Sequence, residues 1–216
     1  MKMKIYQIIL LFLILINYCK TVEVNEIVDL PEPVKTGGMP LNEALNKRRT
    51  QRDFDGSKKL SMELLSQALW SCYGINRPTD EGRTVPSAVA WYPLIVYVFL
   101  EDGVYQYSPK NHHLLKVLDG DHRAITGTQP FVKDAGADFV FIADFNKKSS
   151  MDGDDEHKRR SIYLDSGHLG MSLYLFAASN GLKGVNRAMV DDAAVLDLLE
   201  LDKKDYILTL TFSLGY

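Results

Sequence analysis

The sequence Lys47-Arg48-Arg49-Thr50-Gln51-Arg52-Asp53-Phe54 places three arginines within five residues, at the point where a short amphipathic helix ends. The helix is predicted because apolar side chains recur at helical spacing from Leu41 to Leu45. Arginine binds phosphate through two parallel hydrogen bonds and keeps its charge at any physiological pH. The stretch therefore predicts an anion-binding site, and the alternative interpretation of the same residues is a solvated basic surface.

A long segment without helical or strand periodicity, residues 75–93, comes later in the chain. Gly82, Pro86 and Pro93 forbid a regular helix there, and a loop of this length inside a compact domain is usually functional. Its core, Pro86-Ser87-Ala88, has small side chains that let backbone groups approach a flat ring. For the neighbouring Trp91 and Tyr92, packing in the core and contact with a ligand both remain open.

Three motifs, taken in their order and spacing, resemble the FMN-dependent nitroreductase family over roughly residues 40 to 216. They are Arg-Arg-Thr-Gln-Arg-Asp-Phe at 48–54, Pro-Ser-Ala-Val-Ala-Trp-Tyr-Pro at 86–93 and Gly-Leu-Lys-Gly-Val at 181–185. The sequence is most similar to the branch that includes the thiazole- and oxazole-forming dehydrogenases, in which a Pro-Ser-Ala segment ending in Tyr-Pro precedes an apolar strand. The resemblance implies a dimeric α+β fold of the nitroreductase type, with a central, mostly antiparallel sheet flanked by helices.

The same resemblance implies that FMN is the cofactor. Its implied contacts are Arg48, Arg49, Thr50 and Arg52 at the phosphate and ribityl chain, Pro86, Ser87, Ala88 and Ala90 at one face of the ring, and Gly184 and Val185 near the N5 and O4 edge. At Ala90 many nitroreductases carry an Asn, so backbone groups are left to make that hydrogen bond. No catalytic residue is identified, because a flavin carries the chemistry itself while the protein orients it.

Apolar periodicity predicts the other elements of the domain. We expect helices over 62–73, 158–179 and 194–199, a weaker helical pattern over 119–137, and strands over 94–100, 104–107, 139–145 and 206–214. Ser61 and Asp191 are the expected N-caps of two helices. The longest helix has a stripe of apolar and small residues that also contains His168. By resemblance this helix forms the dimer interface. We interpret His168 as a core or interface residue. The stripe comprises Leu164, Gly167, His168, Met171, Leu175 and Ala178.

The N-terminus has the pattern of an export signal, with two lysines followed by a short apolar run from Ile5 to Ile16. We therefore expect a signal over 1–21, a linker over 22–40 and the FMN-binding domain over 41–216, in an exported protein. Cys19 stands where a bacterial lipoprotein would be lipidated, so a secreted or periplasmic protein, a lipid-anchored protein and an uncleaved anchor all remain open.

Composition excludes several other classes. The formal net charge of −3 at pH 7 gives no footprint for a nucleic acid. Without the signal only Cys72 remains, and its place on an apolar helical stripe favours a small core residue over a nucleophile. His112 and His113, expected on a short helix, have no ligands at the spacing of a zinc site, so we expect no metal. The acidic run before the longest helix lacks the alternating ligands of a calcium loop.

Three functions are consistent with these residues. The first is an FMN-dependent oxidoreductase that reduces nitroaromatic or quinone-type small-molecule acceptors, with Gln129, Pro130 and Phe131 as the expected substrate wall. The second is oxidation of a peptide azoline or similar ring, which the Tyr-Pro motif suggests. The third is a flavin-binding protein without turnover. An interaction module that has lost the cofactor is disfavoured by the intact set of arginines.

Overall fold

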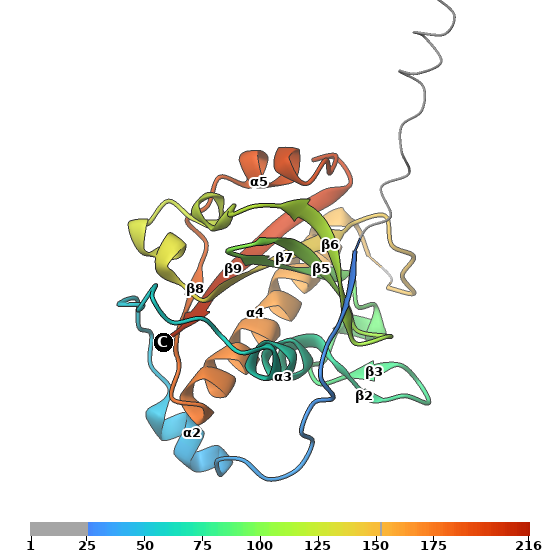
Figure 1. Ribbon diagram of the computed structural model, residues 1–216. Helices are drawn as coiled ribbons and strands as arrows, with labels where there is room; N and C mark the ends of the chain where they lie inside the picture. The colour runs from blue at the N-terminus through green and yellow to red at the C-terminus, as the bar shows by residue number, and fades with distance from the viewer. Residues whose placement is uncertain (1–25, 152) are drawn as a thin grey trace, which may run out of the picture.

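A seven-stranded sheet forms the centre of the computed structural model, which describes residues 26–151 and 153–216 (Figure 1). Its strands follow the order β1-β6-β5-β4-β7-β9-β8, and every neighbouring pair is antiparallel. The strands are β1 (Ile27–Asp29), β4 (Leu94–Leu100), β5 (Gly103–Ser108), β6 (His113–Asp119), β7 (Ala137–Asp144), β8 (Lys183–Arg187) and β9 (Tyr206–Gly215). The predicted α+β fold with an antiparallel sheet is thus confirmed.

Helices cover both faces of this sheet, and a small hairpin stands beside it. The α-helices are α2 (Leu41–Lys47), α3 (Met62–Tyr73), α4 (Asp155–Ser179) and α5 (Asp192–Leu198). The hairpin joins β2 (Ile75–Arg77) to β3 (Gly82–Arg83), and the 3-10 helices are η1 (Ala88–Ala90), η2 (Arg123–Thr126) and η3 (Pro130–Asp134). Figure 1 shows α3 and α4 on one face of the sheet and α5 on the other.

Side-chain alternation along the central strands explains why both faces need a cover. On β4, Val96 and Val98 belong to the core under α3 and α4, whereas Tyr97 and Phe99 belong to the core under α5. Successive side chains of a strand point to opposite faces, so a continuous apolar run buries both. The apolar run predicted as a central strand is therefore β4, in the middle of the sheet.

The helix caps form as the sequence predicts. The Ser61 side chain accepts a hydrogen bond from Leu64 N at 3.3 Å, and the Asp191 side chain accepts one from Ala194 N at 3.0 Å. Cys72 of α3 is fully buried, and burial raises the pKa of its thiol well above the usual range. Its interpretation as a core residue rather than a nucleophile is therefore confirmed.

The longest helix, α4, separates its residues into a buried and an exposed face. Ile162, Leu169 and Leu173 are fully buried against the sheet. Leu164, which belongs to the predicted stripe, is 61% exposed, and Met171 is 38% exposed. Gly167 has nothing within 4 Å of the place where a Cβ would lie, and His168 is exposed in the single chain. Exposure excludes the core alternative for His168, and its place in an interface stays a prediction. Leu164, Gly167, His168 and Met171 are called the α4 stripe below.

The described part of the expected linker is not a free segment. Ile27–Asp29 form β1, which pairs with β6 in the register Val28↔Leu114. Farther along, Ser66 Oγ donates to the carbonyl of Pro31 at 2.5 Å. Val34 N donates to Gln67 Oε1 at 2.7 Å, and Gln67 Nε2 donates to the Val34 carbonyl at 3.1 Å. The linker prediction is wrong for this part, because an edge strand of three residues carries too short a pattern to recognise.

A second error concerns residues 112–137. His113 begins strand β6, so the expected short helix at the two histidines is wrong. The weak helical pattern over 119–137 forms only two short 3-10 helices, η2 and η3. Residues 113–119 are extended because β6 pairs with β5. Such pairing depends on tertiary context more than on the local sequence.

The predicted export signal, the lipidation candidate Cys19 and the first residues of the expected linker lie outside the described residues. Among the residues that are described, no helix combines the length and the apolar character that crossing a membrane requires. Residues 26–151 and 153–216 also contain no group of three His, Cys, Asp or Glu side chains able to hold a metal ion.

Candidate functional site

The arginine stretch lies along the edge strand β8. Gln51 N donates to the carbonyl of Gly184 at 3.0 Å, and Asp55 N donates to the carbonyl of Tyr216 at 2.8 Å. Lys183 Nζ donates to the backbone carbonyl of Asp53 and lies 3.1 Å from its carboxylate. These contacts fix the backbone of the stretch and bring two predicted sets, the arginines and Gly184 with Val185, next to each other.

The guanidinium groups themselves have no acidic partner within residues 26–151 and 153–216. Arg49 and Arg52 are exposed, Arg48 is half-buried, and among the described residues none of the three forms an ion pair or a side-chain hydrogen bond. The Arg48 guanidinium lies 5.3 Å from the centre of the Tyr174 ring. Three cations close together in the chain, without an ion pair among the described residues, are suited to binding an anion.

Tyr174 of α4 connects the arginine stretch to β8. Its hydroxyl is 2.9 Å from Thr50 Oγ1 and accepts a hydrogen bond from Asn186 N at 3.0 Å. The Thr50 hydroxyl, in the middle of the arginine stretch, is therefore held by a side chain that sequence reasoning missed. The only local signal was a tyrosine on the long helix, which is no stronger than the signal of an ordinary core aromatic residue.

Gly184 and Val185, expected near the flavin edge, are buried inside β8. A Cβ on Gly184 would lie 2.6 Å from the Phe212 ring, so the missing side chain makes room for the neighbouring strand. The Gly184 carbonyl accepts from Gln51, as described above. The structure thus explains this glycine by packing, and its contact with a flavin stays a prediction.

The Pro-Ser-Ala loop is fixed by one buried carboxylate on α4. Ser87 Oγ donates to Asp165 Oδ2 at 2.5 Å, and Ala88 N donates to Asp165 Oδ1 at 3.2 Å. Ser87 Oγ in turn accepts from Tyr92 N at 2.8 Å. Burial raises the pKa of the Asp165 carboxyl, and the two hydrogen bonds that it accepts oppose that shift. Sequence spacing gave no signal for this contact, because its partners are 78 positions apart.

The backbone of this loop is strained. Val89, Ala90 and Tyr92 have φ of 48°, 53° and 48°. The left-handed region costs an L-residue about 1–3 kcal/mol and is especially unfavourable for β-branched valine. Ala90 N donates to the carbonyl of Ser87 at 3.0 Å, so the Ala90 amide, one of the backbone groups left to replace an Asn side chain, is already engaged.

Aromatic residues support the loop from behind. Trp91 is 4% exposed and its indole N–H donates to the Lys147 carbonyl at 2.9 Å, which favours core packing for this residue. Arg83 lies between two rings, 3.8 Å from the centre of Tyr73 and 5.0 Å from that of Tyr92. Tyr92 is thereby packed against protein on one side, while Val89 is 56% exposed.

One chain does not bring the predicted FMN contacts together. Asp165, which holds the loop, and Tyr174, which holds Thr50, are nine positions apart on α4. At about 1.5 Å and 100° per residue, they are about 13.5 Å apart along the axis and on opposite sides of the helix. We call Arg48, Arg49, Thr50, Arg52, Gly184 and Val185 the arginine half-site, and Pro86, Ser87, Ala88 and Ala90 the loop half-site. The exposed α4 stripe lies between the two.

The expected substrate wall lies beside the arginine half-site. The Phe131 ring packs against Phe54, which directly follows the arginine stretch, with 6.0 Å between ring centres. The side-chain oxygen of Gln129 is buried without a hydrogen-bond partner among the described residues. This position is compatible with a wall of the site, and the substrate contact itself stays a prediction.

A fourth arginine at the end of β8 has the opposite environment. Arg187 is 4% exposed, and its guanidinium lies 2.8 Å from the fully buried carboxylate of Asp138. It also donates to the Thr126 carbonyl at 2.6 Å. Burial raises the pKa of Asp138 to about 6, while the charge of Arg187 opposes that shift. Arg187 therefore links β8 to β7 and η2, and Asp138 neutralises its charge, so that this guanidinium is not available to a ligand.

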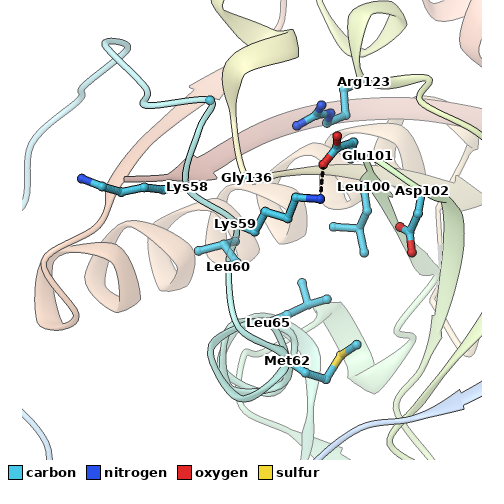
Figure 2. A pocket seen from close by; sticks show the side chains of 11 residues that line it. Lys58, Lys59, Leu60, Met62, Leu65, Leu100, Glu101, Asp102, Arg123 and Gly136 are labelled. Carbon is cyan, nitrogen blue, oxygen red and sulfur yellow. Dashed lines mark ion pairs between the residues drawn. The ribbon is translucent and has the colours of Figure 1, made fainter.

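A separate pocket of about 430 Å³ lies between the start of α3, the β4–β5 turn and the segment that follows the arginine stretch. Figure 2 shows its apolar floor of Leu60, Met62, Leu65 and Leu100. The Lys59 amine pairs with Glu101 at 2.7 Å across it. Its lining includes none of the predicted FMN contacts.

Comparison with known proteins identifies the family. A sequence model of the nitroreductase family matches residues 45–216. A candidate nitroreductase of Methanocaldococcus jannaschii is 33% identical over an alignment of 182 residues, and the match covers 79% of this chain and 88% of that protein. A candidate nitroreductase structure from Ralstonia eutropha is similar with a TM-score of 0.82 and 33% identity, over 89% of this chain and 90% of the other.

A third similarity is to a microcin synthetase. A chain of the Escherichia coli microcin synthetase McbBCD complex, solved with truncated pro-MccB17 bound, has a TM-score of 0.67 and 19% identity over 93% of this chain and 81% of its own. At this identity the similarity shows a shared fold, in line with the branch that the Pro-Ser-Ala and Tyr-Pro motifs indicate. Together with the matched family model, these relatives show that the chain belongs to the nitroreductase family.

Proposed function

We propose that this protein is an FMN-dependent oxidoreductase that reduces nitroaromatic or quinone-type acceptors. The observation that carries the proposal is the arginine half-site, in which Arg48, Arg49 and Arg52 flank Thr50 along the chain and form no ion pair among the described residues. This donor set suits a phosphate monoester, because guanidinium groups bind phosphate oxygens in pairs. Membership of a family whose members bind FMN supports the choice of ligand.

We propose further that each FMN site is shared between two copies of the chain. The two half-sites face away from each other across α4, so a single chain offers one ligand only half of the expected contacts. The α4 stripe lies between them, is exposed, and includes the apolar side chains of Leu164 and Met171. A two-fold pairing along this stripe places the loop half-site of one copy near the arginine half-site of the other, and two-fold dimers are the commonest closed assembly.

The residues of this chain have distinct tasks in the proposed site. The arginines and Thr50 bind the phosphate, and the loop half-site provides a fixed backbone surface for the ring. When bound, FMN would supply the redox chemistry by taking a hydride from a donor and passing electrons to an acceptor. The protein needs no nucleophile of its own for this reaction, which is consistent with a buried, inert Cys72.

The first test is whether the full chain binds FMN. Protein refolded with excess FMN and then desalted should keep one flavin per chain, measured by absorbance after denaturation. A colourless folded protein would contradict the assignment.

The second test separates the reactions. The flavin-loaded protein is reduced anaerobically with dithionite and mixed with a nitroaromatic or a quinone in a stopped-flow instrument. We expect reoxidation faster than that of free reduced FMN under the same conditions. If the flavin stays bound and neither acceptor reacts faster than with free FMN, the azoline dehydrogenase of the McbBCD-like branch or a flavin carrier without turnover replaces the reductase.

A further inference from the structure

The loop from Ser87 to Tyr92 has a strained backbone. Three of its residues have φ near +50°, including the β-branched Val89, and none of them is a glycine. Such a backbone persists only where the surroundings hold it in place, and it is characteristic of functional sites.

The contacts converge on Asp165. Its two carboxylate oxygens accept from Ser87 Oγ at 2.5 Å and from Ala88 N at 3.2 Å, and the carboxylate is 4% exposed. Because the Ser87 hydroxyl gives its hydrogen to Asp165, its lone pairs are oriented to accept from Tyr92 N at 2.8 Å. One carboxylate thus fixes both ends of the strained segment, directly at Ala88 and through Ser87 at Tyr92.

We propose that Asp165 is a positioning residue that holds the loop half-site in its ring-binding conformation. This inference rests on the proposed function for its ligand, but the conformational part stands alone. Hydrogen bonds to a charged group are stronger than those between neutral groups. Asparagine at this position has nearly the same shape but only one acceptor oxygen, and its amide would face one of the two donors.

The test compares Asp165→Asn with Asp155→Asn, which removes the same charge from the exposed first turn of α4. Amide hydrogen exchange is measured without flavin. In Asp165→Asn, exchange at Ala88 and Tyr92 should accelerate by about tenfold or more, because these amides lose their acceptor or its orientation. Exchange at Gln51, which bonds to β8, should be unchanged. Asp155→Asn should alter none of the three.

A second readout connects the contact to ligand binding. The affinity of Asp165→Asn for FMN should fall by about tenfold. Its urea unfolding midpoint, which reports global stability separately, should also fall, because a buried donor loses its charged acceptor. Unchanged exchange at Ala88 and Tyr92, or faster exchange along all of α4, would overturn the positioning role. Should Asp165→Asn fail to fold, Ser87→Ala provides the same exchange comparison at Tyr92.

The two hypotheses fail separately. A wild-type protein that binds no FMN removes the proposed function, and the exchange data then still decide whether Asp165 holds the loop. A wild-type protein that binds FMN, together with an Asp165→Asn variant of unchanged affinity and exchange, removes only the positioning role.

Discussion

The two half-sites on either side of α4 are built in contrasting ways. In the arginine half-site the backbone is held by ordinary hydrogen bonds to β8, and the guanidinium groups have no acidic partner among the described residues. In the loop half-site the side chains are small, and the backbone is strained and bound to a buried carboxylate. The arginine half-site therefore supplies positive charge that a bound anion would neutralise. The loop half-site supplies a backbone conformation that is already formed without a ligand.

The sharpest test of this contrast removes the charge. The double variant Arg48→Ala, Arg52→Ala should lower FMN affinity by about 10²- to 10⁴-fold, since hydrogen bonds to charged groups contribute about 1.5–3 kcal/mol each. Its unfolding midpoint in urea should change little, because neither side chain has an acidic partner among the described residues and only Arg48 contacts an aromatic ring, that of Tyr174. Fluorescence titration measures the affinity.

The matched control is Arg159→Ala, Arg160→Ala, which removes the same charge near the other end of α4. We expect it to bind FMN as the wild type does. An equal loss in both double variants would mean that the arginine stretch acts only through the general positive potential of the surface.

Mixing two defective chains tests whether each site draws on two copies. Ala88→Tyr fills the loop half-site with a bulky side chain, and the double arginine variant disables the other half-site. If each ligand needs half-sites from two chains, random exchange of subunits gives half mixed dimers, each with one intact site, so about a quarter of the sites should recover. Flavin retention after mixing and desalting measures this. No recovery in a mixture shown to exchange subunits would mean that each chain binds its own FMN.

A smaller effect is expected at the strand beneath the arginines. Gly184→Ala should destabilise the fold by about 1–3 kcal/mol, because the added methyl group meets the Phe212 ring at 2.6 Å. Gly167→Ala is the control, since nothing lies within 4 Å of its Cβ position. Alanine there should stabilise the helix of a separated chain by about 0.5–1 kcal/mol. Urea unfolding gives both values, and a neutral Gly184→Ala would show that β8 can move aside.

The smallest effect concerns the turn that ends the arginine stretch. Hydrogen bonds from Ser57 and Lys58 lower the pKa of Asp55 to about 2, from 3.8. A lowered pKa contributes stability that is fully present above the unfolded value and is lost as the pH falls through the folded value. The stability difference between the wild type and Asp55→Asn should therefore narrow below about pH 4 and vanish near about pH 2. Urea unfolding at several pH values checks this, and a constant difference would exclude Asp55 as its cause.

Features whose residues are neighbours in the chain could be predicted from the sequence, whereas contacts between distant residues could not. The arginine stretch was recognisable because its residues are neighbours in the chain and follow a helix with apolar periodicity. The central strand β4 was recognisable because both of its faces are buried. β1 and β6 were missed because strands at and near an edge have weak patterns and owe their conformation to their partners. Asp165 was missed because nothing in the spacing links it to Ser87, so only the fold reveals the contact.

The docking of the arginine stretch on β8 has a consequence for the order in which the protein acquires its structure. Asp53 and Lys183 are 130 positions apart, and Thr50 and Tyr174 are 124 positions apart. During synthesis the arginines therefore emerge long before the strand against which they lie. Contacts of such high sequence separation form late and slow the folding of a domain. A nascent chain that ends before β8 carries the whole arginine motif but lacks the strand that holds its backbone, so affinity for the phosphate should appear only after β8 has been synthesised.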